Sequence, residues 1–473
     1  MPLSEIWHFS YFPVCAIMKQ THKERNHLMA VRHMTEGSVF PHLLSYSVPL
    51  ILGNLLQLTY NAADSVIAGR FIGKDALAAV GTSSPVMNIL ILGISGICIG
   101  ASVIMSEFFG AGEEALLKKE LSTTLLFGLF FSLVLAGAGA LLAEPLLLAL
   151  SVPEDILGIS AVYLRIIFFG TPFTYFYNAY SSALKSIGDS TAALKFLAFS
   201  SVLNLGLDVV FIGFLGFGIA CSAMTTVFAE AVSAFLCIWY VRRKIPLLCL
   251  TPRSLCIDRG LLAKTLRYGG ITALQQSCQP VGKLLIQGAV NPLGVDAIAA
   301  FNAVSRIDDF AFTPEQSIAS GITTFVAQNR GAGKPRRIRR GFLCGLALEA
   351  GYWLFICTAV LLLRYPAMTL FVSESEPEII ELGCRYLGTM AFFYLLPAFT
   401  NGFQGFYRGI GKMGVTLAGT FIQTSLRVVF VYLLTPSMGL LGTAWACAVG
   451  WIVMLLYEVP LFFRVSARER GKA

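Results

Sequence analysis

Residues 73–79 read GKDALAA and residues 294–300 read GVDAIAA, so glycine, aspartate and alanine recur at matching positions in the two halves of the chain. The triplet GAG at 110–112 recurs at 331–333 with the same spacing. A repeat that keeps its register over several segments indicates duplication of one structural unit. We therefore expect a fold that is built from two related halves.

The composition indicates an integral membrane protein. Of the 473 residues, 56% are hydrophobic and 13% are charged, and the mean hydropathy is +0.72, whereas soluble domains carry roughly 25% charged residues. A helix needs about 20 residues to cross about 30 Å of hydrocarbon. We predict an all-α membrane protein with twelve transmembrane helices, six in each half, at 41–68, 80–108, 121–150, 156–183, 191–215, 217–241, 265–292, 297–328, 342–363, 382–406, 413–434 and 440–463.

Positive charge is distributed unevenly between these spans. Most Lys and Arg residues lie in the tail 1–40 and in every second loop, while the alternate loops hold only Arg70, Lys74 and Arg364. Because basic loops stay on the cytoplasmic side, both termini are predicted to be cytoplasmic. An even number of helices gives the two repeats the same orientation, so they should be related by a pseudo-two-fold axis along the membrane normal.

The predicted spans also define the domain organisation. An N-lobe at 41–245 and a C-lobe at 263–465 are joined by a cytoplasmic linker at 246–262 and flanked by the tails 1–40 and 466–473. The first tail has one apolar stretch, which is too short to span a membrane and lacks a signal-peptide cleavage site. It is either native or the product of an upstream start before Met34, and we assign it no function.

Several functional classes are disfavoured. The eleven cysteines are scattered without a C-x-x-C motif, and all five histidines lie at or before His42, so neither a disulfide framework nor a metal centre is expected. We predict no enzymatic activity and no cofactor. The basic runs 242–244 and 336–340 follow from membrane orientation, so no nucleic-acid partner is expected.

The first span carries a polar stripe. Asn54, Gln57, Asn61 and Asp64 are spaced by three or four residues and share one helix face. Hydrogen bonds between helices, worth about 0.6 kcal/mol each, explain the three amides. A carboxylate at mid-span costs about 2.5–3.5 kcal/mol, so we expect a function or a specific partner for Asp64. Earlier in the span, Pro49 removes one helical hydrogen bond and permits a bend that would move the stripe.

A second stripe lies in the fifth span, at Ser201, Asn204 and Asp208. If Asp64 and Asp208 share a cavity, the two carboxyl groups could bind a proton, or hold Na⁺ together with neighbouring amide and hydroxyl oxygens. The alternative is that Asp208 pairs with an intramembrane arginine.

The second half has no counterpart of the first-span acid. Gln276, Gln279 and Lys283 take the places of the three amides, and Ile286 takes that of Asp64. These residues are candidates for the polar lining of a cleft.

The sequence LRVVF at 426–430 resembles LDVVF at 207–211, which sets Arg427 against Asp208. Lys283 and Arg427 could be fixed positive charges that balance acids within the membrane. Alternatively, the side chain of Arg427 extends to the membrane surface.

The other acids within the spans are weaker candidates for a functional site. Arg306 and Asp309 stand one turn apart in the eighth span, which favours an internal ion pair. Glu230 and Glu315 have no partner that the sequence indicates, and they are secondary candidates.

Four motifs resemble the multidrug and toxic compound extrusion (MATE) transporters. They are PLILGNLLQLTYNAADSVIAGRFIGKDALAAVG at 49–81, GASVIMSEFFGAG at 100–112, YLRIIFFGTPFTYFYNAYSSALKSIGD at 163–189 and VAQNRGAGK at 326–334, within a similarity that covers 34–465. The resemblance implies twelve helices in two lobes that face a central cleft. It also implies export of small organic substrates, driven by entry of H⁺ or Na⁺.

By this resemblance, Asp64 matches the first-helix acid of the family and Pro49 matches its first-helix bend. Asn204 and Asp208 match the N-x-x-x-D pattern of the fifth helix. The family's supporting polar positions are approximated by Asn178, Tyr163 and Thr226.

The NorM branch of the family has a second acidic site in the C-lobe. Here Gln279 stands near its seventh-helix acid, and the tenth span at 382–406 has no acid. The resemblance therefore favours coupling in the N-lobe, as in transporters of the DinF kind.

These observations predict an antiporter coupled to H⁺ or Na⁺ that exports amphipathic, often cationic, drugs or toxic compounds by alternating access. We expect a monomer in the cell membrane, with the lipid bilayer and small organic substrates as its partners. The alternative is a flippase for a lipid-linked sugar or another lipid, which would need a basic cleft. Charge reversal at Lys283 and Arg427 would separate the two.

Overall fold

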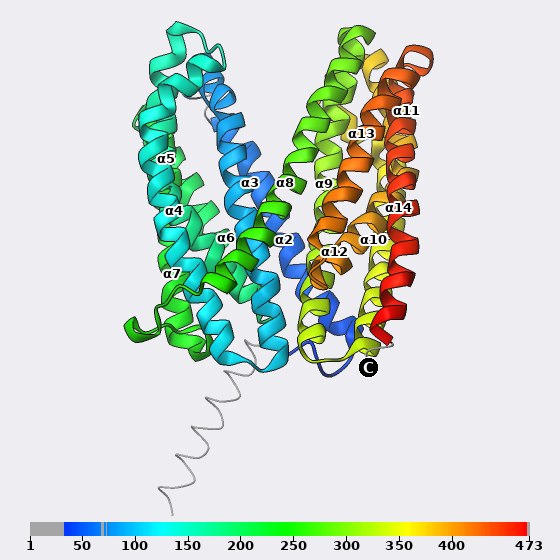
Figure 1. Ribbon diagram of the computed structural model, residues 1–473. Coiled ribbons are helices and arrows are strands. Elements are labelled where there is room, and N and C mark those ends of the chain that lie inside the picture. The colour runs from blue at the N-terminus through cyan, green and yellow to red at the C-terminus, as the bar shows by residue number, and fades with distance from the viewer. Residues whose placement is uncertain (1–32, 68–70, 72, 471–473) are drawn as a thin grey trace, which may run out of the picture.

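The computed structural model describes residues 33–67, 71 and 73–470, and its helices form two bundles side by side (Figure 1). The N-lobe consists of α2 (Val39–Ile67), α3 (Lys74–Ala111), α4 (Glu114–Ala149), α5 (Glu154–Ser186), α6 (Ser190–Asp208) and α7 (Ile219–Lys244). The C-lobe consists of α8 (Arg259–Val290), α9 (Val295–Gly331), α10 (Pro335–Thr369), α11 (Pro377–Phe393), α12 (Leu395–Gly409), α13 (Met413–Met438) and α14 (Leu440–Arg470). Of the predicted tail at 1–40, residues 1–32 lie outside the described residues.

The predicted fold class is confirmed. In the described chain α11 and α12 form one broken span, so that each lobe contributes six spans. Nine described helices are long and apolar enough to cross a membrane on composition alone, and the α11–α12 pair makes a tenth. The remaining two, α8 and α9, are more polar because each carries side chains that face the space between the lobes. The lobe boundaries at 41–245 and 263–465 stay predictions.

The tenth span is broken in the C-lobe. Its two parts, α11 and α12, meet at Tyr394 with a bend of 43°. Pro397 has no N–H to donate to the carbonyl oxygen of Phe393, one turn earlier, and its ring crowds that turn. The helix therefore breaks where a proline interrupts its hydrogen-bond ladder.

The fifth span is irregular directly after a candidate residue. α6 ends at Asp208 and continues as the π-helical turn η2 (Val209–Phe214). Such turns are frequent at functional sites in helical proteins. By contrast, α2 continues as one helix through Pro49, so the bend predicted there stays a prediction.

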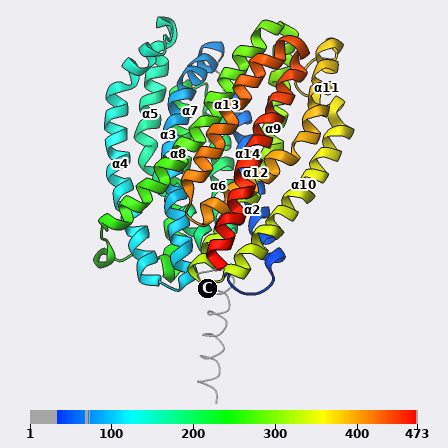
Figure 2. The same ribbon diagram turned by 45° about the vertical axis from the view of Figure 1, so that its right-hand side comes forward.

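Two helices connect the lobes. α2 packs on α6 in its own lobe and on α9 in the other, while α8 packs on α13 in its own lobe and on α3 in the other. Figures 1 and 2 both show α8 crossing α3. A Cβ atom on Gly100 or on Gly269 would collide with the main chain of the opposite helix. Glycine at these positions therefore lets α3 and α8 approach closely.

The lobes also meet where α3 crosses α9, near the C-terminus of the described chain (Figure 1). A Cβ atom on Gly110 would collide with the carbonyl oxygen of Gln328, and one on Gly331 with the carbonyl oxygen of Glu107. The two main chains are thus in direct contact at this end. Away from it, the lobes diverge.

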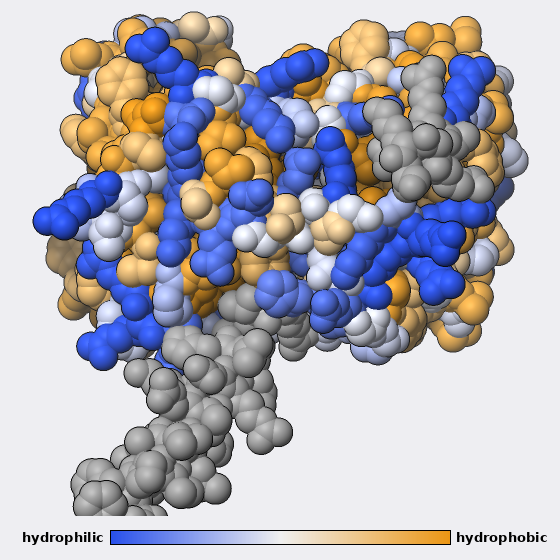
Figure 3. Space-filling model, turned by 60° about the horizontal axis from the view of Figure 1, so that its bottom comes forward, coloured by the Kyte–Doolittle hydropathy of each residue, from blue (hydrophilic) through white to orange (hydrophobic). Residues whose placement is uncertain are grey.

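Hydrophilic side chains gather at the same end of the molecule (Figure 3). Lys264 Nζ lies 3.3 Å from Glu107 Oε2, and Arg330 Nε lies 3.8 Å from Glu107 Oε1. Lys119 Nζ lies 2.7 Å from Asp258 Oδ2, and the hydrogen bond from Lys119 lowers the pKa of Asp258. Ion pairs therefore join the lobes where their main chains touch.

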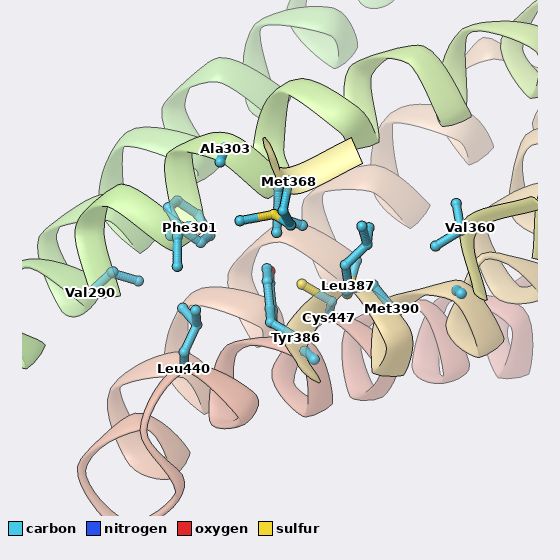
Figure 4. Close-up of a cluster of buried hydrophobic side chains, with 14 of the residues drawn as sticks. Val290, Phe301, Ala303, Val360, Met368, Tyr386, Leu387, Met390, Leu440 and Cys447 are labelled. Atoms are coloured by element: carbon cyan, nitrogen blue, oxygen red, sulfur yellow. The ribbon is translucent and has the colours of Figure 1, made fainter. Parts of the chain in front are cut away.

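Apolar side chains fill the lobes and also cover their outer faces. In the C-lobe, Phe301 of α9, Met368 of α10 and Tyr386 of α11 pack together and are at most 3% exposed (Figure 4). Ile286, the repeat counterpart of Asp64, belongs to this cluster and is fully buried. Leu141, on the outside of α4, is 79% exposed. Large apolar side chains in contact with the surroundings are expected of a protein that faces lipid.

Candidate functional site

A cavity of about 640 Å³ lies between the lobes. α2 and α3 form its N-lobe wall, and α8, α9, α12, α13 and α14 form its C-lobe wall. Its volume falls within the range of roughly 300–1,000 Å³ that is common for small-molecule sites. The cavity is therefore large enough for an organic substrate.

Most of the predicted cleft candidates line this cavity. They are Asn54, Gln57, Asn61, Gln276, Gln279 and Arg427. Arg427 thus points to the space between the lobes and does not extend to the membrane surface. Lys283 is outside the lining, and its Nζ lies 3.2 Å from Asp309 Oδ1. The predicted ion pair between Arg306 and Asp309 is wrong, because the long side chain of Lys283 reaches Asp309 from the neighbouring helix.

Much of the C-lobe wall was not predicted from the sequence. Gln275 Nε2 donates to Gln404 Oε1 at 2.8 Å and to Thr420 Oγ1 at 3.1 Å, and Gln404 Nε2 donates to Thr420 Oγ1 at 3.0 Å. Arg408 also lines the cavity. The sequence signal was nevertheless present, because polar residues three or four positions apart also occur here. Gln404 and Arg408 in α12 are four residues apart, and Thr420 and Gln423 in α13 are three residues apart.

A second polar site lies inside the N-lobe, where α2 faces α6. The carboxyl groups of Asp64 and Asp208 lie close enough for their charges to interact. Asp208 is fully buried and accepts a hydrogen bond from Thr225 Oγ1, while Asp64 is half-buried. Asp208 therefore has Thr225 and Asp64 as neighbours, and the alternative prediction, an ion pair with an intramembrane arginine, does not hold in the described chain. Neither acid belongs to the described lining of the central cavity.

Polar groups from three helices surround the two acids. The hydroxyl of Tyr60 donates to Asn204 Oδ1, and it lies close enough to Asp64 and Asp208 to interact with their charges. Tyr163 of α5 is buried and also lies close to both acids. Tyr60 was not predicted, although it stands one turn before Asp64 on the same helix.

Two predicted supporting residues lie farther out. Asn178 Nδ2 donates to the main-chain oxygen of Thr174 at 2.8 Å, and the hydroxyl of Thr174 donates to Glu230. Thr226 Oγ1 donates to a carbonyl oxygen one turn earlier at 3.0 Å. The adjacent Thr225 is the residue that contacts an acid of the pair. Thr226 is thus one position away from the direct contact.

The C-lobe buries acids of its own. Glu315 of α9 and Glu349 of α10 are fully buried and lie close enough for their charges to interact. Asn401, which lines the cavity, places its Nδ2 atom 3.5 Å from Glu315 Oε2. Both oxygens of Glu349 lack a hydrogen-bond partner in the described chain. From its sequence position Glu315 is a secondary candidate, and Glu349 was not predicted.

Comparisons with known proteins agree with this architecture. The family model described as MatE matches twice, at residues 49–210 and 272–433, so that each lobe holds one match. The probable multidrug resistance protein YoeA of Bacillus subtilis (strain 168) is 30% identical over 381 residues, which cover 78% of this chain and 81% of that protein. The probable multidrug resistance protein YpnP of the same organism is 28% identical over 415 residues, covering 88% and 92%.

The fold has close relatives among solved structures. The outward-facing conformation of a multidrug resistance MATE family transporter of the MOP superfamily superposes with a TM-score of 0.87 at 21% identity, covering 93% of this chain and 98% of that one. The expected absence of enzymatic activity agrees with relatives that are transporters. The chain therefore belongs to the MATE family of multidrug efflux transporters, as the repeated family match and the relative at 30% identity show.

Proposed function

We propose that this protein is a proton-coupled antiporter that exports small organic molecules across the cell membrane by alternating access. The observation that carries the proposal is the proximity of Asp64 and Asp208 in the N-lobe. Two carboxylates this close repel each other, so binding of a proton by one of them is favoured. H⁺ is the coupling ion in this proposal, and the separate pH and Na⁺ gradients described below test it against Na⁺.

A single helix can link proton binding to the substrate cavity. α2 carries Asp64 at the N-lobe site and Asn61 at the cavity, one turn apart. It also reaches the C-lobe, where Asn54 Nδ2 donates to Ser317 Oγ at 3.0 Å. Loss of the proton makes the two acids repel each other, which would move α2, with Pro49 as the bend. Such a movement would change the cavity wall and the contact between the lobes together.

The orientation follows from the positive charges. With both termini cytoplasmic, the end closed by Gly110 and Gly331 faces the cytoplasm, and the diverging ends of the lobes face outward. The similarity to a solved transporter in an outward-facing conformation supports this assignment. In this state a substrate would leave to the outside and protons would enter the N-lobe site from there.

The names of the relatives support organic drugs as substrates. The expectation that these substrates are cationic gains no support from the cavity, because its described lining includes no Asp or Glu. The flippase alternative requires a basic cleft, and Arg408 with Arg427 is the observation that favours it. It remains the second candidate function.

Transport by purified protein in liposomes tests the coupling. Rhodamine 6G and carboxyfluorescein, a cation and an anion built on one ring system, would be followed under separately imposed pH and Na⁺ gradients. We expect a pH gradient alone to drive transport of at least one probe, and Asp64→Asn to abolish it. Glu144→Gln removes an exposed N-lobe acid that pairs with Arg165, and it should transport normally. Transport driven by Na⁺ alone, or unchanged in Asp64→Asn, would refute proton coupling at this site.

A further inference from the structure

The central cavity carries positive charge in its wall. Arg408 of α12 and Arg427 of α13 line it, and no acidic residue is present in the lining that the structure describes. A bare cation would meet repulsion here, whereas an anion would be attracted. The wall is thus unsuited to the cationic compounds that the sequence led us to expect.

Nearby acids do not occupy the guanidinium groups. Neither Arg408 nor Arg427 forms an ion pair with a carboxylate of the described chain. Asp308 attracts Arg427 at longer range but accepts its hydrogen bond from the hydroxyl of Tyr394. Glu458 interacts with Arg408 only through its charge, and neither of its carboxyl oxygens has a described hydrogen-bond partner. Arg408 Nε donates to the main-chain oxygen of Gln404 at 3.4 Å, and Arg427 lies close to Cys447. Arg427 Nε has no acceptor in the described chain and is available to a ligand.

Two buried donors in the wall lack an acceptor within the part of the chain that the structure describes. They are the Nε atom of Arg427 and the Nε2 atom of Gln276, and both residues line the cavity. A buried donor without a partner is costly, so a ligand that brings acceptor oxygens is favoured. Lys283 does not supply such a donor, because it is paired with Asp309 outside the lining.

The rest of the wall suits a polar molecule. Amide side chains line the cavity on α2, α8, α9, α12 and α13, whereas Phe312 and Trp451 are the aromatic residues in the described lining. Amides can donate and accept hydrogen bonds, so they can contact hydroxyl groups, sugar oxygens or heterocycles. An aromatic cage, which would bind an organic cation through its ring faces, is not formed by two rings.

We propose that the cavity binds an organic anion that carries phosphate or carboxylate groups. The anionic group contacts Arg408 and Arg427, because a guanidinium matches both groups through paired hydrogen bonds. The polar body of the ligand contacts the amides of the wall. This inference rests on the proposed export function and specifies its substrate class. A water-soluble phosphate and a lipid-linked diphosphate share this chemistry.

Binding to matched probes tests the inference without an ion gradient. Purified full-length protein in lipid nanodiscs would be titrated with ATP and adenosine, and with carboxyfluorescein and rhodamine 6G. We expect the anionic member of each pair to bind at least about tenfold more tightly, in line with charge-assisted hydrogen bonds. Tighter binding of adenosine and rhodamine 6G by the unmodified protein would overturn the proposal.

Substitutions in the cavity wall test which residues cause the preference for anions. In Arg408→Gln/Arg427→Gln the preference for anions should disappear, whereas Arg385→Gln, which neutralises an exposed arginine of the same lobe, should keep it. The double lysine variant preserves charge and should retain part of the preference, which covers the case in which the glutamine variant does not fold. A preference that is unchanged in folded Arg408→Gln/Arg427→Gln would contradict the assigned contacts.

Two further comparisons separate the remaining outcomes. Farnesyl diphosphate that competes better than ATP would identify a lipid-linked ligand, and the reverse would identify a soluble one; either result retains the anion site. Anion preference without gradient-driven transport would refute the antiporter and leave the cavity assignment intact. Gradient-driven transport of rhodamine 6G without any anion preference would refute the cavity assignment alone.

Discussion

The two lobes have the same fold but different residues at equivalent positions. Asp208 of the N-lobe corresponds to Arg427 of the C-lobe, and Asp64 corresponds to Ile286. Asp208 is buried beside a second acid, Arg427 lines the central cavity, and Ile286 belongs to the apolar core. The glycine and alanine positions that shape the helix contacts recur in both halves. Divergence at a few polar positions was therefore sufficient to give one lobe a candidate ion site and the other a candidate substrate wall.

The largest effect is expected at Asp208, whose C-lobe counterpart is the cation Arg427. Asp208→Asn should reduce transport driven by a pH gradient to the level of empty liposomes, because one carboxyl group of the pair is lost. The reciprocal change, Arg427→Gln, should leave the pH dependence intact and weaken substrate binding. If both variants lost pH-driven transport while binding substrate normally, the assignment of proton binding to the N-lobe and substrate binding to the C-lobe wall would be refuted.

A change in the C-lobe sharpens the comparison. Glu349→Leu should raise the free energy of unfolding by about 1–3 kcal/mol, because it removes a buried polar group without a described hydrogen-bond partner. Transport should persist. Thermal and denaturant unfolding in detergent would measure the stability, with Glu349→Gln as a control that should not gain it. Loss of pH-driven transport in both variants would show that the C-lobe also binds the coupling proton.

A smaller effect is expected at Tyr60. Tyr60→Phe removes the hydroxyl that donates to Asn204, which is buried. Loss of this hydrogen bond should cost about 1 kcal/mol, which corresponds to a rate of pH-driven transport about fivefold lower. Tyr432→Phe in the C-lobe removes an exposed hydroxyl that donates to the carbonyl oxygen of Leu285 at 3.3 Å, and transport should not change. Equal effects of the two variants would argue against a special role for the hydroxyl of Tyr60.

The smallest effect is expected at the ion pair between α8 and α9. Lys283 and Asp309 have side chains that are 50% and 43% exposed, and exposed pairs contribute at most about 1 kcal/mol. Lys283→Gln should therefore change neither stability nor anion binding appreciably. A clear fall in anion binding, measured by titration in nanodiscs, would add Lys283 to the cavity wall.

The helical spans could be predicted because length and hydropathy are local properties of the chain. The span predicted at 80–108 is longer in the structure, at Lys74–Ala111, since helices extend beyond the hydrocarbon. The break at Tyr394 was missed although Pro397 signals it. Prolines at 49 and 145 lie within continuous helices, so a proline alone does not identify a break.

The site could be predicted only in part, because contacts between separate helices are not local properties of the chain. Helical spacing places Asn54, Gln57 and Asn61 on one face of their own helix, and the structure has them in the cavity wall. Spacing does not show which helices meet. The pairing of Asp309 with Lys283, and the contact of Tyr60 with Asn204, depend on packing between separate helices and so were not predicted.

The crossing of α3 and α9 has a consequence for the origin of the fold. Gly110 and Gly331 are equivalent positions of the repeat, and so are Glu107 and Gln328. Gly110 packs on Gln328, and Gly331 packs on Glu107. Each glycine therefore contacts, in the other half, the residue that lies three positions before the equivalent glycine. This reciprocal pattern is that of an isologous interface between two identical subunits. The contact between the lobes thus preserves the geometry of a homodimer within one chain, and Glu107, with its cationic partners, shows where the fused copies have become unequal.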